Sequence, residues 1–349
     1  MEKKEKLIRI YEQAGFQLLD LLKKLEDGPN KRNKERLLQQ IAEILNTLTG
    51  NASELAAEIL SEAYSDGSNE AIDTLVDQGI EKVKDSLKSM IHQRAVQEIV
   101  DDCFYSILEA TDHMSEDIKE RIEEVIRRAN QRILIDGVSR RQALKDAIIE
   151  LSQKQITGMI YKNGTHMPAD KYLAGVIQYY QRKAHVDGSI NRIQENGVDL
   201  VYVNKVGITC DLCAQFQGRV YSISGNDSRF PRLEKKPPYH SHCVHSTSAW
   251  IEEYQGEHEA KRMIDLSNKP FQDTRTAAQI RRYNQIQREK ARKNETRKQW
   301  IRYKGRMGDS FPSLKVFASQ KARNTAKYQE WQDEYRGIGI EIKKREQNE

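Results

Sequence analysis

The sequence predicts a mainly α-helical protein that carries one small α+β module in its middle. Apolar residues recur every three or four positions over the first 155 residues, which is the period of amphipathic helices. Two short runs rich in β-branched and aromatic residues, near 199–206 and 218–223, predict strands. Hydrophobic residues make up 38% of the chain and charged residues 31%. This balance favours thin helical layers over one thick core.

We divide the chain into three regions on these patterns. Residues 1–155 are a helical N-terminal arm, residues 156–255 are a small central α+β module, and residues 256–349 are a basic helical tail. In the arm, stripes of apolar residues predict helices over residues 3–26, 37–48, 53–65, 80–110, 115–136 and 143–155.

Turn-forming residues separate the predicted helices of the arm. We expect breaks at Asp27–Asn30, at Gly50, at Asp66–Asn69 and at Gly137, because Gly, Pro and Asn favour helix ends and turns. Ser139-x-x-Gln142 has the spacing of a capping box, in which a serine side chain caps the first turn of a helix.

The elements after the arm are predicted in the same way. Tyr161–Gly164 reads as a turn, and Met167–His185 reads as a helix. In the tail, we expect one helix from Arg275 to Gly305 and a last one from Ser313 to Arg336, both with aromatic residues at helical spacing.

Charge is distributed unevenly along the chain. Residues 1–150 carry 22 Lys and Arg against 30 Asp and Glu, whereas residues 151–349 carry 35 against 22. Between Arg36 and Lys82 there are nine acidic residues and no Lys or Arg. An acidic front and a basic back can face different partners, and the basic part is the candidate for nucleic acid.

Cysteine use and hydropathy bound the compartment. Three of the four cysteines cluster beside histidines, which does not resemble a disulfide framework. Cys103 lies on the apolar face of a predicted helix and is interpreted as a buried structural thiol. We expect no signal peptide and no membrane span, and therefore a soluble protein made in a reducing cytoplasm.

The strongest chemical signal is a Cys/His cluster in the central module. Cys210 and Cys213 form a C-x-x-C pair, and His240 and Cys243 follow after a turn-rich loop. Two soft-ligand clusters separated by a short loop have the spacing of a tetrahedral zinc site. We expect a structural zinc held by these four residues in a zinc-knuckle-like module. His240 ranks first as the histidine ligand and His245 second, with His242 also within reach.

Other interpretations of the cluster are open. Three reduced cysteines could pack in a small core without metal. A catalytic metal is disfavoured because no acidic general base is nearby in the sequence. A redox C-x-x-C would need a thioredoxin-like strand–helix context. A nuclease using His240 and His242 would depend on those two residues alone. No catalytic set is evident, so we expect no enzyme.

The tail carries a dense run of cations. From Arg275 to Arg306 there are twelve Lys and Arg and only two acids. One interpretation is a solvated helix that keeps the protein in solution; the other is non-specific contact with the phosphates of double-stranded DNA. The run favours the second slightly. The candidate contacts are Arg281, Arg282, Arg288, Lys290, Arg292, Lys293, Arg297, Lys298, Arg302 and Lys304.

Four motifs of the central module repeat a known pattern. They are Gly197-x-Asp199-Leu200-Val201-x-Val203, Cys210-x-x-Cys213-Ala214, Gln217-Gly218-Arg219-Val220-Tyr221-Ser222-Ile223-Ser224-Gly225 and Pro237-Pro238-Tyr239-His240-x-x-Cys243-x-His245. On these motifs the chain resembles the tailed-phage minor capsid proteins, phage minor capsid protein 2 among them, and the head-morphogenesis family of phages Mu and SPP1. The Tyr283–Lys304 run and the helical front leading to Tyr161-x-x-Gly164 extend the resemblance.

The chain departs from the family pattern at the cluster. Val244 stands where an arginine is common, Ser241-His242 replaces Pro-Asn, and Asp211 replaces a proline. These changes leave the expected ligands intact but remove any contact that the arginine would make.

The resemblance implies a low-copy component of the phage head, located inside the virion near the portal and made in the host cytoplasm. Its expected partners are the portal protein or the major capsid protein, which the helical arm would contact, and packaged DNA. It would form an oligomer only within the assembly and would not bind membrane. The competing hypothesis is a metal-dependent nuclease or a phage-delivered toxin.

Overall fold

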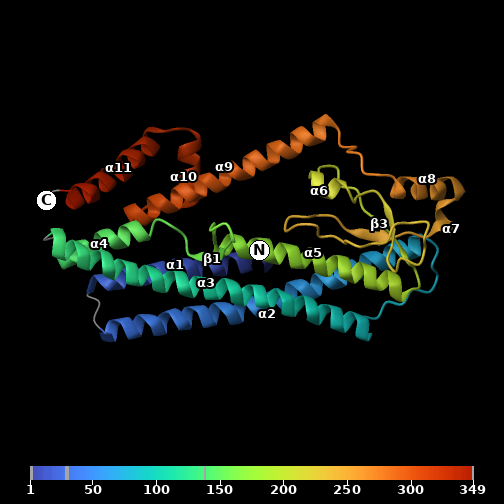
Figure 1. The fold of residues 1–349 in the computed structure, drawn as a ribbon, viewed down its shortest axis with the longest axis horizontal. Helices are drawn as coiled ribbons and strands as arrows, with labels where there is room; N and C mark the ends of the chain where they lie inside the picture. The colour runs from blue at the N-terminus through green and yellow to red at the C-terminus, as the bar shows by residue number, and fades with distance from the viewer. Residues whose placement is uncertain (1–2, 28–30, 137–138, 348–349) are drawn as a thin grey trace. The chain divides into compact units, whose positions relative to one another are not determined.

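The computed structural model describes residues 3–27, 31–136 and 139–347, and its helices and strands are shown in Figure 1. The predicted breaks at Gly28–Asn30 and at Gly137 lie outside these residues. The helices are α1 (Lys3–Lys23), the short 3-10 helix η1 (Lys24–Asp27), α2 (Lys31–Asp77), α3 (Met90–Asp136), α4 (Arg140–Leu151), α5 (Ala169–Glu195), α6 (Asp211–Ala214), α7 (Glu252–Gln255), α8 (Glu257–Asn268), α9 (Ala277–Met307), α10 (Leu314–Ala322) and α11 (Ala326–Gln347). The strands are β1 (Thr157–Ile160), β2 (His166–Pro168), β3 (Leu200–Val203), β4 (Val220–Ser222) and β5 (Thr247–Ala249). The mainly helical prediction is confirmed.

The chain forms two compact units, each discontinuous in sequence. The first unit comprises Met1–Leu7, Ala52–Ile107 and Leu173–Ile286, and the second comprises Ile8–Asn51, Leu108–Tyr172 and Gln287–Glu349. The boundaries between the units fall inside several long helices. The division into 1–155, 156–255 and 256–349 follows the sequence alone and stays a prediction.

Helix α2 corrects two of the predicted breaks. It continues through Gly50 and through Asp66–Asn69, so the helices expected at 37–48 and 53–65 are one element. The buried face does not stop at either glycine: Leu48 and Ala52 are buried around Gly50, and Tyr64 and Ala71 are buried around Gly67. Burial of this face offsets the lower helix propensity of glycine, which amounts to about 1 kcal/mol per residue.

Helix α3 corrects the prediction in a similar way. It joins the helices expected at 80–110 and from Ser115, because Met114 and Ile118 are both fully buried and carry the apolar face across the junction. It begins only at Met90. The preceding residues 82–89 form no helix, and the guanidinium of the fully buried Arg192 donates to the carbonyl oxygens of Lys84 and Asp85 at 2.8 and 2.9 Å.

In the first unit, a three-stranded antiparallel sheet has the order β4–β3–β5. Val201 and Val203 on one face of β3 pack against Leu75 of α2 and Ile193 of α5. Leu200 on the other face packs with Met263 of α8. The strands predicted near 199–206 and 218–223 are confirmed as β3 and β4. The sequence does not predict β5, because Thr247–Ala249 contains one β-branched residue and no aromatic one.

In the second unit, β1 and β2 form a hairpin around the predicted turn, where Gly164 has a φ of +75°. A cluster of aromatic residues joins the last three helices, with Phe317 fully buried at its centre. The helix predicted over 313–336 is two helices, α10 and α11, separated at Asn324, whose φ is +46°.

Two details complete the comparison with the sequence. Ser139 caps α4 as predicted, its hydroxyl accepting from the backbone N–H of Gln142 at 3.3 Å, while the Gln142 side chain donates to Asp146. None of the helices in the described part of the chain combines the length and the apolar character needed to cross a membrane.

A close helix–helix approach generates a test of this fold. A Cβ atom on Gly67 of α2 would lie 1.9 Å from the carbonyl oxygen of His185 in α5, whereas a Cβ atom on Gly50 would meet nothing within 4 Å. We expect Gly67→Ala to lower the free energy of unfolding by about 1–3 kcal/mol, because the helices must move apart. Gly50→Ala is the matched control and should raise it by up to about 1 kcal/mol. Urea denaturation measures both, and equal effects of the two substitutions would contradict this packing.

Candidate metal centre

The sheet of the first unit determines where the Cys/His cluster forms. Strand β3 pairs antiparallel with β5, and Val203 at the end of β3 lies opposite Thr247 at the start of β5. The chain leaving β3 and the chain approaching β5 therefore lie at the same end of the sheet. The first of these segments carries Cys210 and Cys213, and the second carries His240, Cys243 and His245.

The first segment has the local form of a knuckle. Cys210 is the N-cap of the four-residue helix α6, and its sulfur accepts from the backbone N–H of Cys213 at 3.4 Å. Gly218, with a φ of +75°, then turns the chain into β4.

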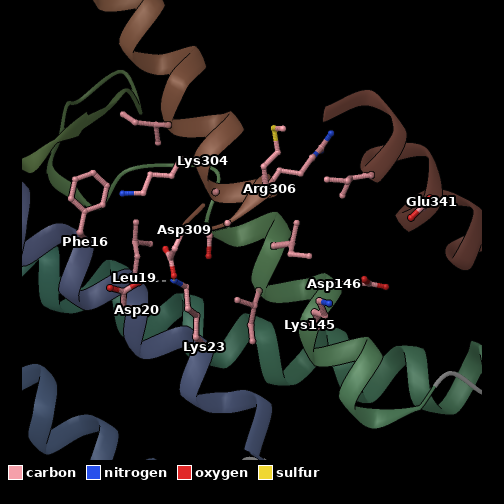
Figure 2. A pocket seen from close by; sticks show the side chains of 18 of the residues that line it. Phe16, Leu19, Asp20, Lys23, Lys145, Asp146, Lys304, Arg306, Asp309 and Glu341 are labelled. Carbon is pink, nitrogen blue, oxygen red and sulfur yellow. Dashed lines mark hydrogen bonds and ion pairs between the residues drawn. The ribbon is translucent and has the colours of Figure 1, made fainter. Parts of the chain in front are cut away.

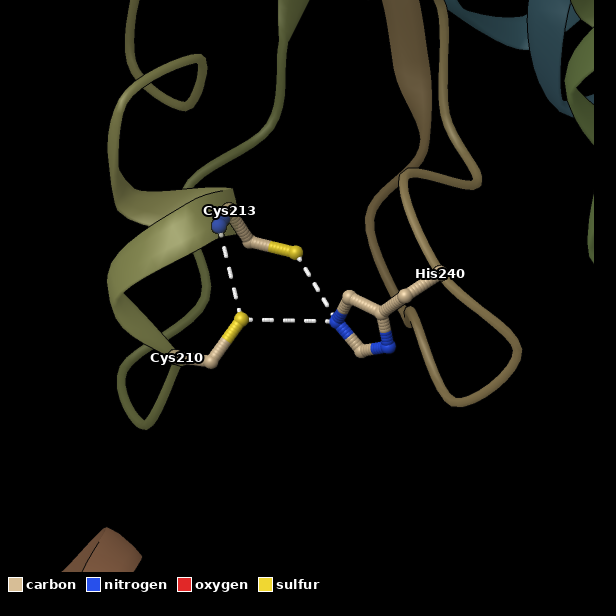
Figure 3. A group of neighbouring side chains, drawn as sticks. All are labelled: Cys210, Cys213 and His240. Atoms are coloured by element: carbon tan, nitrogen blue, oxygen red, sulfur yellow. Dashed lines mark hydrogen bonds between the residues drawn. The ribbon is translucent and has the colours of Figure 1, made fainter. Parts of the chain in front are cut away.

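The second segment brings its donors to the same point. His240 Nε2 lies 3.4 Å from Cys210 Sγ and 3.1 Å from Cys213 Sγ, as Figure 3 shows. Cys213 Sγ lies 3.8 Å from Cys243 Sγ, and Cys243 Sγ lies 3.6 Å from His245 Nδ1. Zinc bonds of about 2.3 Å to sulfur and 2.0–2.1 Å to nitrogen place tetrahedral ligands about 3.5–3.8 Å apart. Three of the four separations are close to this range, whereas the 3.1 Å between His240 Nε2 and Cys213 Sγ is shorter than two ligands of one tetrahedral zinc would show.

Among the described residues the donors form two overlapping triads. One contains Cys210, Cys213 and His240, and the other contains Cys213, Cys243 and His245. Cys213 is therefore shared. The four residues of the predicted ligand set do not form one group: Cys210 and His240 lie in the first triad, and Cys243 lies in the second with the alternative His245. The exposed His242 instead contacts Gln178 at 3.3 Å.

Hydrogen-bond polarity distinguishes the two candidate histidines. The amide oxygen of Gln217 accepts from the Val206 N–H at 2.9 Å, which fixes the orientation of that amide. The same oxygen lies 2.9 Å from His245 Nε2, so His245 carries its proton there and its Nδ1 lone pair faces Cys243. Metal-binding histidines usually donate their second ring N–H in this way.

His240 has the opposite arrangement. Its Nδ1 accepts from the His242 backbone N–H at 3.2 Å, so the proton of the neutral ring is on Nε2, where it points at the sulfurs of Cys210 and Cys213. This arrangement suits a hydrogen-bond donor to sulfur better than a metal ligand. The geometry thus favours His245 over His240, the reverse of the order expected from sequence.

Burial and charge also suit metal binding. Cys213, Cys243 and His245 are at most 3% exposed. The Cys213 thiol donates to the Cys243 sulfur, which lowers the pKa of Cys243 and raises that of Cys213. Tyr239 and Phe216 stack beside the cluster with ring centroids 4.3 Å apart. A buried group of cysteine sulfurs beside imidazole nitrogens is a soft-ligand site.

Cys103 lies apart from this cluster. It is 1% exposed on α3, and burial raises its pKa to about 12. The prediction that its side chain is buried is confirmed.

The predicted nucleic-acid contacts fall into two groups on α9. Arg297 is only 17% exposed and pairs with Glu12 and Asp170 at 2.8 and 2.5 Å. The ammonium of Lys304 lies 4.5 Å from the centroid of the Phe16 ring. The other eight are exposed: Arg281, Arg282, Arg288, Lys290, Arg292, Lys293, Lys298 and Arg302.

Two residues beside the cluster were not singled out from the sequence. Gln217 orients His245, and its only sequence signal is its place in the motif that follows the cysteine pair. Arg275 donates to the carbonyl oxygen of Thr209, next to Cys210, at 3.2 Å and pairs with Asp273. Arg275 was counted as part of the basic run, but its partners show that it anchors the chain before α9.

The fold and the cluster together define a class: a mainly helical protein in which a short β-sheet presents a Cys/His centre. The family model for phage minor capsid protein 2 matches residues 5–336, nearly the whole chain. The chain therefore belongs to the phage minor capsid protein 2 family, as the sequence motifs indicated, and membership implies a virion component. Neither the curated proteins nor the solved structures contain a match to it.

Proposed function

We propose that the chain is a portal-proximal component of the phage head that helps head assembly and contacts packaged DNA, with a structural zinc in its central module. The observation that supports this most is the meeting of five cysteine and histidine donors inside a chain of the minor capsid family. The role is structural, and we propose no reaction for it.

The zinc would stabilise a sheet that is small. Strands β3, β4 and β5 have three or four residues each, whereas typical strands have about five or six. The segment from Gly225 to Ser246 between β4 and β5 contains no helix or strand. Zinc bound to Cys210 and Cys213 before this segment and to ligands near its end would contribute its binding free energy to folding.

Zinc content tests this proposal. We expect about one zinc per chain in protein purified without chelator, measured by inductively coupled plasma mass spectrometry. Cys213→Ser should remove it, because Cys213 belongs to both triads. His245→Ala should lose more zinc than His240→Ala, since His245 has the favourable tautomer.

The matched control for these variants is Cys103→Ser, which removes a buried thiol outside the cluster and should leave the zinc in place. Less than about half an equivalent in the unsubstituted chain would rule out a zinc site of this kind. Equal loss in the two histidine variants would leave the cluster as a site but would contradict the preference for His245.

The DNA contact is proposed for the middle of α9. Residues 287–295 are all exposed, and they include Arg288, Lys290, Arg292 and Lys293. A helix that is polar on every side does not owe its stability to burial. Cations spaced along such a helix can approach phosphates without reading the base sequence.

The salt dependence of DNA binding tests this assignment. Replacing the four cations Arg288, Lys290, Arg292 and Lys293 by Gln should reduce the slope of log K against log salt concentration by about 3–4, because each lost phosphate contact removes about 0.9. The matched control removes four exposed cations from α10, its C-cap and α11: Lys315, Arg323, Lys327 and Arg336. Similar slopes in both variants, measured by filter binding, would mean that α9 makes no special contact.

The place in the virion is tested separately. Quantitative mass spectrometry of nuclease-treated, gradient-purified particles of the phage that encodes the chain should find its peptides in low copy number. Presence in procapsids alone would assign it to assembly and not to the finished head. Absence from both particles would contradict the proposed function, and the nuclease and toxin hypotheses would then be tested next.

A further inference from the structure

The second unit contains a cavity that no residue of the cysteine cluster lines. It lies between α1, α4, α9 and α11 and has a volume of about 530 Å³ (Figure 2). Cavities of roughly 300–1,000 Å³ with an apolar lining and a few polar groups are typical small-molecule sites in proteins.

The apolar part of the lining comes from several helices. Leu19 of α1, Ile148 of α4 and Ile301 of α9 are buried beneath it, and Phe16 and Met307 are half-buried at its sides. Gly305 lets α9 approach α4 closely, since a Cβ atom there would lie 2.3 Å from the carbonyl oxygen of Ser152. An occupant with an apolar body would therefore remove both its own surface and this lining from water.

Each acidic residue of the lining lies within 4 Å of a cation. Asp146, which is fully buried, receives Arg345 at 3.0 Å and Arg132 at 3.2 Å. Lys23 lies 2.7 Å from Asp309 and 2.9 Å from Asp20. The last acid, Glu341, is 70% exposed and lies 3.9 Å from Arg345.

Three cations of the lining have no carboxylate within 4 Å among the described side chains. Lys145 is exposed on α4, at the lower edge of the cavity in Figure 2. Lys304 lies over the ring of Phe16. Arg306 lies 4.0 Å from the centroid of the Tyr335 ring and donates to the Tyr335 carbonyl oxygen, while its buried Nε–H has no hydrogen-bond partner among the described residues.

We propose that this cavity binds a small anionic amphiphile, a molecule with an apolar body and one carboxylate. The apolar lining would take the body, and the cations without carboxylate partners would attract the head group, with Lys145 free to reach it. This site goes beyond the proposed function and depends on neither the zinc nor the DNA contact.

The test uses decanoate, below the concentration at which it forms micelles, with the full chain and isothermal titration calorimetry. We expect saturable binding of decanoate at one site. Decan-1-ol, which has no charge, should have an affinity at least about tenfold lower. Lys145→Glu should weaken decanoate binding by about tenfold or more, because an attraction becomes a repulsion. Ile149→Trp, which adds a bulky ring to the lining, should abolish it.

Arg141→Glu is the matched control, since Arg141 is an exposed cation of the same helix that does not line the cavity. It should leave decanoate binding unchanged. The proposal is overturned if decanoate shows no saturable binding, if Arg141→Glu and Lys145→Glu weaken it equally, or if decan-1-ol binds as tightly as decanoate. Thermal unfolding of each variant identifies any that fails to fold, and Lys145→Glu, at an exposed side chain, carries the test if Ile149→Trp does not fold.

Discussion

The antiparallel pairing of β3 with β5 is the constraint on which the candidate site depends. Because Val203 lies opposite Thr247, the segments that carry Cys213 and Cys243, thirty residues apart in sequence, meet at one end of the sheet. The sheet itself is held by Val201 and Val203 against α2 and α5, and by Leu200 against α8. The helices of the first unit therefore position the cluster, and a bound zinc would in turn hold together the segments that the short strands hold only weakly.

Outer hydrogen bonds decide more about the site than the identity of the donors does. Both His240 and His245 point a ring nitrogen at sulfur, and distance alone would accept either as a ligand. The difference lies in the other ring nitrogen: the Gln217 amide oxygen accepts a hydrogen bond from His245 Nε2, whereas the backbone N–H of His242 donates to His240 Nδ1. The same reasoning applies to the cations of the tail. Arg297 is held in an ion pair with Glu12 and therefore stabilises the fold, whereas Arg288 is exposed to solvent.

The sequence was sufficient where the signal is local. The C-x-x-C pair, the second ligand segment, β3, β4 and the cap at Ser139 were all predicted, because each depends on spacings of a few residues. The sequence was insufficient where packing between elements distant in the chain determines the local structure. Gly67 reads as a helix break, yet it is the residue that lets α2 approach α5. Strand β5 exists because β3 offers it a partner, and the cavity has walls from four helices spread over more than 300 residues.

The most direct test of the metal centre is X-ray absorption at the zinc K-edge of the purified, zinc-containing chain. The account predicts a first shell of three sulfur atoms at about 2.3 Å and one nitrogen at about 2.0–2.1 Å, with the outer scattering of a single imidazole. A shell of two sulfurs and two imidazoles would show that His240 and His245 both bind and that one cysteine does not. A shell of oxygen and nitrogen alone would contradict the account, because the zinc would then lie outside the cysteine cluster.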